Sequence, residues 1–271
     1  MRASLFGTLA GGGAAPLDPD AQAFITAAGI TDPTQQTAIN DLVVGLKADS
    51  LWTKMVALYP FVGGTDASHK WNLKDPRDLD AAFRLTFVGG LTSSTQGVLA
   101  DGSTGYANTH LNPNAILTPD NFHISLYTRT YNYAANTEMY AAFTGSAGAI
   151  RFNQRNPSDV TLAVMGSVMF GSVSGSNTQS QGFFLTSRTP DPLIRLCRNN
   201  IQLGTLVPIS TPTLTTLELP LFATNFGGSI MSFHPGQLCC FTIGSGLSNA
   251  ESTILYNLIN AMQISLGRDI D

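Results

Sequence analysis

Charged residues are scarce in this sequence. Asp, Glu, Lys and Arg make up 12% of its 271 residues, against about 25% in typical soluble domains. Gly, Ser, Thr and Asn fill the difference, and such a polar but uncharged surface favours a crowded assembly or an extracellular β module over a free cytosolic enzyme. The net charge of −4 comes without clustered Lys and Arg, so we expect no nucleic-acid partner.

Cysteine and long apolar runs are also scarce. Three cysteines, two of them the adjacent Cys239 and Cys240, exclude a disulfide framework and a metal-binding spacing. Strand alternation would place the adjacent pair on opposite faces. No apolar run reaches the roughly 18 residues of a membrane span, so we expect no membrane insertion. The N-terminal apolar stretch is short and broken by glycines, which favours retention, with a cleaved signal peptide as the alternative.

Motifs for catalysis are missing. The sequence has no phosphate loop, no HExxH and no CxxC. A retaining glycosidase needs two carboxyl groups about 5 Å apart, but the acidic residues of the C-terminal body are isolated in sequence: Asp120, Glu138, Asp159, Asp191, Glu218 and Glu251. We therefore predict no catalytic residues and no enzyme. A polysaccharide hydrolase or lyase stays as the alternative, because distant carboxylates can meet in a fold.

The N-terminal quarter differs in pattern from the rest. Residues 1–17 are predicted to form an extended docking arm in which Leu5, Phe6 and Leu9 contact a neighbouring subunit, and a disordered terminus is the alternative. Residues 18–64 are predicted to be a helical segment. Asp32 and Pro33 suit a helix start, and the apolar stripe Leu51, Trp52, Met55, Leu58 and Tyr59 predicts a further helix that ends at Pro60.

From Ala82 the apolar residues recur with a period of two, first at Phe83, Leu85 and Phe87 and then in about eleven short strand candidates. Asn199-Asn200 predicts a tight hairpin turn. Ser248 and Glu251 predict a capping box that starts a C-terminal helix. We therefore expect a mainly β protein, in which residues 65–271 form an antiparallel β-sandwich closed by that helix.

Two stretches of the sequence concentrate polar groups. In Thr65–Gly90, charges of both signs alternate, which predicts an ion network joining the helical segment to the sandwich rather than a catalytic cluster. The loop Asp101–His110 offers oxygen, amide, aromatic and imidazole groups that suit sugar hydroxyls. We predict carbohydrate contacts at Asp101, Tyr106, Asn108 and His110, with a plain Gly-rich turn as the alternative. Its oxygens would also suit Ca²⁺, but we assign no cofactor and no metal site.

The sequence resembles two groups of proteins. Leu193–Asn200 leading into Ile201–Leu206, and the later Leu247-Ser248 followed by Glu251, resemble laminin-G-like and concanavalin-A-like jelly rolls over roughly residues 80–265. The segments Asp20–Ile30, Tyr59–Gly64 and His69–Asp78 resemble virion structural proteins of tailed phages and prophages of Bacteroidota. There a small helical segment precedes a lectin-like jelly roll.

The resemblance implies a non-enzymatic bacteriophage virion protein in a tail, fibre or capsid-decorating position. Its jelly roll would bind other virion proteins and copies of itself, assembled in the host cytoplasm, with adhesion to a host-surface glycan as a further expectation. A secreted, extracellular bacterial carbohydrate-binding module is the other alternative.

Overall fold

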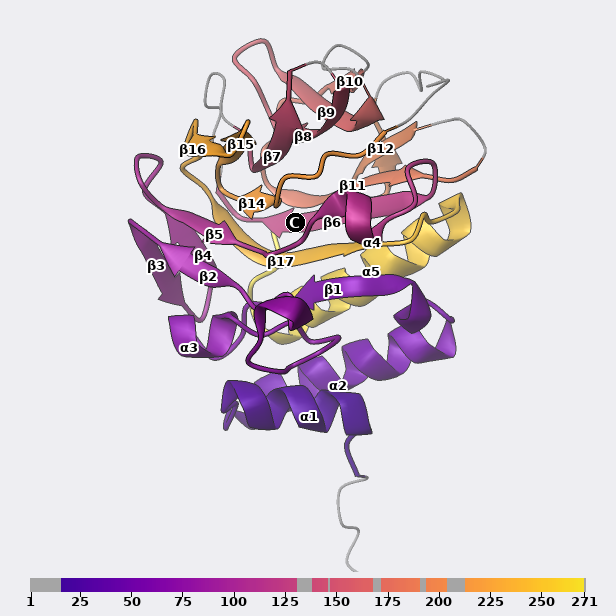
Figure 1. The fold of residues 1–271 in the computed structure, drawn as a ribbon. Coiled ribbons are helices and arrows are strands. Elements are labelled where there is room, and N and C mark those ends of the chain that lie inside the picture. The colour runs from indigo at the N-terminus through magenta and orange to yellow at the C-terminus, as the bar shows by residue number, and fades with distance from the viewer. Residues whose placement is uncertain are drawn as a thin grey trace, which may run out of the picture.

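The computed structural model describes residues 16–130, 138–145, 147–167, 172–190, 194–203 and 213–270. The predicted assembly residues Leu5, Phe6 and Leu9 lie outside these ranges. Three layers follow one another in Figure 1: a layer of helices, a sheet packed on it, and a second sheet packed on the first. We call the sheet next to the helices the inner sheet and the other one the outer sheet.

The helical layer is built from both ends of the chain. It contains α1 (Pro19–Ala28), α2 (Pro33–Ala48) and α5 (Asn249–Ser265). Two single-turn helices, α3 (Asp66–His69) and α4 (Pro113–Ile116), and two 3₁₀ turns, η1 (Trp52–Lys54) and η2 (Asp80–Ala82), lie in the connections. None of the described helices is long and apolar enough to cross a membrane.

The inner sheet has eight strands, in the order β13-β12-β11-β6-β17-β4-β3, and β1 pairs with the remaining length of β17. All its pairs are antiparallel. The strands are β1 (Met55–Tyr59), β3 (Leu91–Ser94), β4 (Gly97–Ala100), β6 (Phe122–Thr128), β11 (Gly182–Arg188), β12 (Ile194–Arg198), β13 (Ile201–Gln202) and β17 (Gln237–Gly244).

The outer sheet has nine strands, in the order β10-β9-β8-β7-β14-β5-β2, with β15 and β16 added beside β7. Only the β15–β7 pair among those described is parallel. The strands are β2 (Thr86–Val88), β5 (Tyr106–Asn108), β7 (Tyr140–Thr144), β8 (Ala147–Asn153), β9 (Val160–Ser167), β10 (Ser172–Ser176), β14 (Pro220–Leu221), β15 (Thr224–Phe226) and β16 (Ser229–Met231). The predicted antiparallel jelly-roll sandwich is confirmed.

Two apolar cores hold the layers together. Phe122, Ile124 and Leu126 of β6, which alternate along the strand, point into the core between the sheets. The next residue, Tyr127, belongs to the second core, where the inner sheet meets α1, α2 and α5. Both faces of the inner sheet are therefore buried, and the apolar stripes of the helices serve this packing.

The predicted helix over Leu51–Tyr59 is wrong. This stretch forms η1 and then strand β1, whose Tyr59 pairs with Phe241 of β17. Met55 and Leu58 enter the core under the helices, while Ala57 and Tyr59 enter the core between the sheets. A short run that is apolar on both faces fits a helix and a buried strand equally well, so periodicity alone misassigned it.

Two smaller expectations also need correction. Cys239 and Cys240 do not face opposite cores, since both pack in the core under the helices. A bulge in β17 at this point places one extra residue opposite β6, and such a bulge turns two successive side chains to one side. The strand predicted from Phe83 starts only at Thr86, because Phe83 has φ +60° and ends η2.

Two local sequence signals are confirmed. Asn199 and Asn200 have φ of +46° and +61° and form the predicted turn between β12 and β13. The Ser248 hydroxyl accepts from the Glu251 N–H while the Glu251 carboxylate accepts from the Ser248 N–H, which is the predicted capping box of α5.

The capping box gives a stability prediction. Ser248→Ala removes the acceptor for the Glu251 N–H and should lower the free energy of unfolding by about 1 kcal/mol, measured by urea denaturation. Asn257→Ala, at an exposed position of the same helix, should leave stability unchanged or raise it slightly. Equal stability of Ser248→Ala and the wild type would show that α5 does not depend on its cap.

The charged stretch Thr65–Gly90 forms the predicted ion network. Asp78 pairs with both Lys70 and Arg84, at 2.9 Å in each case, and Arg84 also pairs with Asp80. Beneath these ion pairs the Asn72 side chain accepts from the backbone N–H of Leu58 in β1. The Asn72 side chain also donates to the Ala82 carbonyl, so the stretch holds β1 beside η2.

Candidate functional site

Among the described elements, no helix covers the far face of the outer sheet (Figure 1). Alternation decides which side chains lie there. In β7, Tyr140 and Ala142 enter the core between the sheets, whereas Ala141 and Phe143 point away from it. The small apolar cluster on this far face contains only strand residues: Ala141, Phe143, Ala149, Leu162 and Val164.

Asp101, at the tip of the predicted carbohydrate-binding loop, organises its own turn. Its Oδ1 accepts from the backbone N–H groups of Ser103, Thr104 and Gly105 at 2.9–3.0 Å. Its Oδ2 accepts from the hydroxyls of Ser103 and Thr104. These hydrogen bonds hold the pKa of the Asp101 carboxyl well below its usual range. The carboxylate is thus occupied within the loop, and its contact with sugar stays a prediction.

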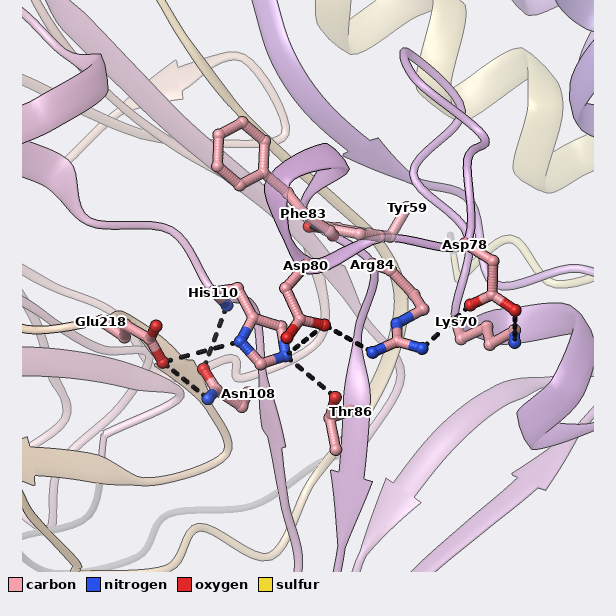
Figure 2. Close-up of polar contacts among 10 residues, drawn as sticks. All are labelled: Tyr59, Lys70, Asp78, Asp80, Phe83, Arg84, Thr86, Asn108, His110 and Glu218. Carbon is pink, nitrogen blue, oxygen red and sulfur yellow. Dashed lines mark hydrogen bonds and ion pairs between the residues drawn. The ribbon is translucent and has the colours of Figure 1, made fainter.

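The other three predicted residues divide between two places. Tyr106 lies beside Phe233, with ring centroids 6.3 Å apart. Asn108 and His110 come together with residues from two other segments, as Figure 2 shows. We call this group the His110 cluster; it consists of Asp80, Arg84, Thr86, Asn108, His110 and Glu218.

The His110 ring lies between two carboxylates (Figure 2). Its Nε2 is 2.9 Å from Thr86 Oγ1 and 3.5 Å from Asp80 Oδ1, and its Nδ1 is 3.8 Å from Glu218 Oε2. Asn108 fixes this arrangement from both ends, since Nδ2 donates to Glu218 at 2.7 Å and Oδ1 accepts from the His110 N–H. His110 itself has φ +55°, an uncommon conformation for a non-glycine residue.

This cluster suits binding better than glycoside hydrolysis. Two catalytic carboxyl groups must face each other across the scissile bond, but here the imidazole ring occupies the space between Asp80 and Glu218. Asp80 is also committed to Arg84. The His110 cluster therefore presents hydrogen-bond donors and acceptors at the surface. Among the described residues, no group of three or more His, Cys, Asp or Glu side chains could hold a metal ion.

A groove of about 350 Å³ lies further across the outer sheet, around β15 and β16. We call it the Phe226 groove. Its apolar walls include Phe226 and Met231, whose residues are 42% and 40% exposed, and a two-glycine turn, Gly227-Gly228, joins the strands that carry them. The lining residues are Glu138, Phe143, Arg151, Thr224, Phe226, Met231 and Ser232.

The polar side of the Phe226 groove is an ion pair between Arg151 and Glu138. Glu138 is buried, and it also accepts from the Thr224 hydroxyl at 2.9 Å. The Arg151 guanidinium lies 5.2 Å from the Phe143 ring centroid, and the Phe143 and Phe226 rings meet edge to face at 5.2 Å. The groove thus combines partly exposed aromatic surface with hydrogen-bond donors held in fixed positions.

The groove and the His110 cluster are connected. Asn225, next to Phe226, donates from Nδ2 to the backbone carbonyl of Glu218 at 2.9 Å. Pro220 of β14 pairs with Asn108 of β5, and Leu221 pairs with Tyr140 of β7. The β14–β5 and β14–β7 pairings thus connect the strand that carries Asn108 of the His110 cluster to β7, which borders the Phe226 groove.

Sequence reasoning missed most of this arrangement. Glu218 reaches His110 only through the pairing of β14 with β5, and Glu138 reaches Arg151 only through the pairing of β7 with β8. One local signal was available: Gly227-Gly228 between Phe226 and Met231 is a typical two-residue hairpin turn, which would have placed both apolar side chains on one hairpin.

No family model and no curated protein matches this sequence. Among solved structures, domain 4 of AbnA, a GH43 extracellular arabinanase from Geobacillus stearothermophilus in complex with arabinotriose, has a TM-score of 0.51 at 13% identity, over 74% of this chain and 98% of that one. The fold of this chain is thus similar to that of a complete sandwich domain.

Two toxin structures are also similar in fold. A botulinum neurotoxin type C structure, described as dependent on two ganglioside molecules for cell entry, has a TM-score of 0.57 at 10% identity, over 78% of this chain and 53% of that one. The serotype D binding domain has a TM-score of 0.54 at 11% identity, over 77% and 52%. This chain therefore spans about half of each toxin structure, and at these identities the likeness shows the jelly-roll sandwich alone.

Proposed function

We propose that this protein is a non-enzymatic, lectin-like jelly roll that binds glycans on the far face of its outer sheet. The observation that carries the proposal is the Phe226 groove, where partly exposed aromatic and thioether surface lies beside the Arg151–Glu138 pair. Similar sandwiches whose descriptions name arabinotriose and gangliosides support it.

The chemistry of the face fits a sugar. The apolar C–H surface of a sugar ring would stack on Phe226, and the exposed part of the Arg151 guanidinium would donate to ring hydroxyls. Asn108, His110 and Glu218 would supply further hydrogen bonds for a longer chain. Because the donors are already held by Glu138 and Phe143, binding would cost little side-chain ordering.

Removing the aromatic wall tests the site. Phe226→Ala should weaken binding of a glycan selected on a glycan array by about tenfold or more, measured by isothermal titration calorimetry. Ile201→Ala is the matched control, because Ile201 is 69% exposed on the inner sheet, and it should bind as the wild type does. Equal affinity of Phe226→Ala and wild type would place the site elsewhere.

A protein that binds no glycan on the array would contradict the proposed function itself. Release of reducing ends from a polysaccharide by the purified protein would instead favour the hydrolase or lyase alternative.

The setting we propose is a virion, in a tail, fibre or capsid-decorating position, with other virion proteins and copies of the same chain as partners. The support is the resemblance of Asp20–Ile30, Tyr59–Gly64 and His69–Asp78 and the low charge of the chain. An extracellular carbohydrate-binding module fits the similar structures equally well. Mass spectrometry of purified particles and of culture medium separates the two settings.

A further inference from the structure

A second groove lies on the opposite side of the molecule, between α2 and α5. It consists of three adjoining cavities of about 110, 370 and 200 Å³, all of which reach Ser265. The first two share Ala38 and the last two share Thr34, so the three cavities follow one another along the surface. We call it the α2–α5 groove.

The lining of this groove suits an apolar peptide with small residues. Ala38, Ala261 and Ser265 have short side chains that allow a backbone to approach closely, and Leu42, Leu258 and Met262 give an apolar base. Asp41 lines the same cavity, and no ion pair or hydrogen bond of its carboxylate occurs among the described residues. The first cavity therefore offers a negative charge without a partner next to apolar surface. The third cavity is lined by Asp32, which caps α2 through the Gln35 N–H, and by Arg268, which donates to backbone carbonyls.

The N-terminal arm of the chain has the complementary composition. Residues 1–15, which precede the described part, contain Leu5, Phe6 and Leu9 among Gly and Ala, and Arg2 is their only cationic side chain. Fifteen residues reach at most about 50 Å when extended, several times the diameter of one helix. The arm thus has both the length and the charge to place Arg2 at Asp41 and its apolar residues along the groove.

The position of Asp18 indicates whose groove the arm reaches. Asp18 is anchored to Asn40 and Lys47, on the side of α2 that faces α1, whereas the groove lies on the side that faces α5. An arm would have to wrap around α2 to reach the groove of its own chain, but a second copy can be reached directly. We propose that the N-terminal arm of one copy binds in the α2–α5 groove of another.

This contact would link copies of the protein through the helical layer and leave the outer sheet free. It is independent of glycan binding, because its residues lie on the other side of the inner sheet. Mutual exchange of arms would give a closed dimer, and one-way insertion would give rings or filaments.

Two full-length variants with complementary defects test the proposal. Leu5→Asp combined with Phe6→Asp replaces apolar side chains of the arm with charged ones. Ala261→Trp, at an exposed position, fills the groove. Size-exclusion chromatography with light scattering should show self-association of the wild type, monomers of each variant alone, and a one-to-one complex when the two variants are mixed. Ile264→Trp, at an α5 position 54% exposed and outside the groove, should associate as the wild type does.

Exchanging the charges of Asp41 and Arg2 provides a second test, which does not depend on whether the fold tolerates Ala261→Trp. Asp41→Arg should weaken self-association at least tenfold, and mixing it with an Arg2→Asp chain should restore association. A wild type that stays monomeric, a mixture that forms no complex, or an Ala261→Trp variant that still associates would each overturn the proposal.

Discussion

Replacing Arg268 with alanine is expected to lower the free energy of unfolding by about 3–5 kcal/mol, because several buried carbonyls lose their donor. Arg268 is only 1% exposed and lies just after α5. Its guanidinium donates to the Gln263 side chain and to four backbone carbonyls, those of Pro60, Phe61, Thr95 and Cys239. Burial lowers the pKa of Arg268, yet a guanidinium keeps its proton in proteins.

The size of the effect follows from what the substitution leaves behind. Buried carbonyls that lose their donor are not rehydrated, and each costs about 1–3 kcal/mol. Those carbonyls belong to the end of β1, the β3–β4 turn and the bulge of β17, so one side chain connects three segments of the inner sheet. Urea denaturation of Arg268→Ala measures the loss.

The matched control is Arg77→Ala. Arg77 pairs with Asp75 on the surface, with 64% of its side chain exposed, and its removal should change stability several-fold less. A loss for Arg268→Ala no larger than that for Arg77→Ala would show that water replaces the guanidinium.

Acidification is expected to destabilise the protein through His123. This histidine is fully buried in β6, where Nδ1 donates to the Ser245 carbonyl at 2.6 Å and Nε2 accepts from the Thr242 hydroxyl at 3.1 Å. Burial lowers the pKa of His123 from 6.5 to about 4. The unfolded chain therefore takes up a proton at a higher pH than the folded chain does.

The sign and window of the effect follow from these two pKa values. The stability is fully present above the unfolded pKa of 6.5, falls as the pH drops below it, and stops falling near the folded pKa. Between pH 7 and pH 5 this one group should remove about 2 kcal/mol. His69, whose pKa burial lowers to about 3, acts in the same direction.

Urea denaturation at both pH values measures the dependence. In His123→Gln the amide keeps a donor and an acceptor but does not titrate, so the difference between pH 7 and pH 5 should shrink by about 2 kcal/mol. An unchanged difference would mean that the folded protein protonates His123 without cost.

The fold could be predicted from sequence wherever a local signal was decisive. The Ser248–Glu251 capping box and the Asn199-Asn200 turn depend on residues within four positions of each other, and both formed as expected. The helix predicted to include Met55–Tyr59 was wrong because this stretch forms a strand by pairing with β17, far along the chain. The prediction that Cys239 and Cys240 point to opposite faces was wrong because the bulge at this point has no signature in the residues that form it.

The candidate site was harder to predict because its contacts join segments that are far apart in sequence. Asn108 and His110 were singled out because they sit in one loop, and the structure does place them in one cluster. Their partners Asp80 and Glu218 come from other segments. From the sequence, Asp80 was assigned to a structural ion network and Glu218 was an isolated acidic residue. Phe226 and Arg151 carried no local hint of a shared groove, since β7 lies between their strands.

The place of β17 in the inner sheet has a consequence for synthesis of the protein. This strand pairs with β6 on one side and with β4 and β1 on the other, and it follows all the other described strands in sequence. During translation, β1, β4 and β6 leave the ribosome long before the partner that joins them. The helices α1 and α2 must likewise wait for α5 before their shared core closes. We therefore expect the nascent chain to expose apolar strand edges until β17 and α5 have been synthesised, and chaperones to bind it during that interval.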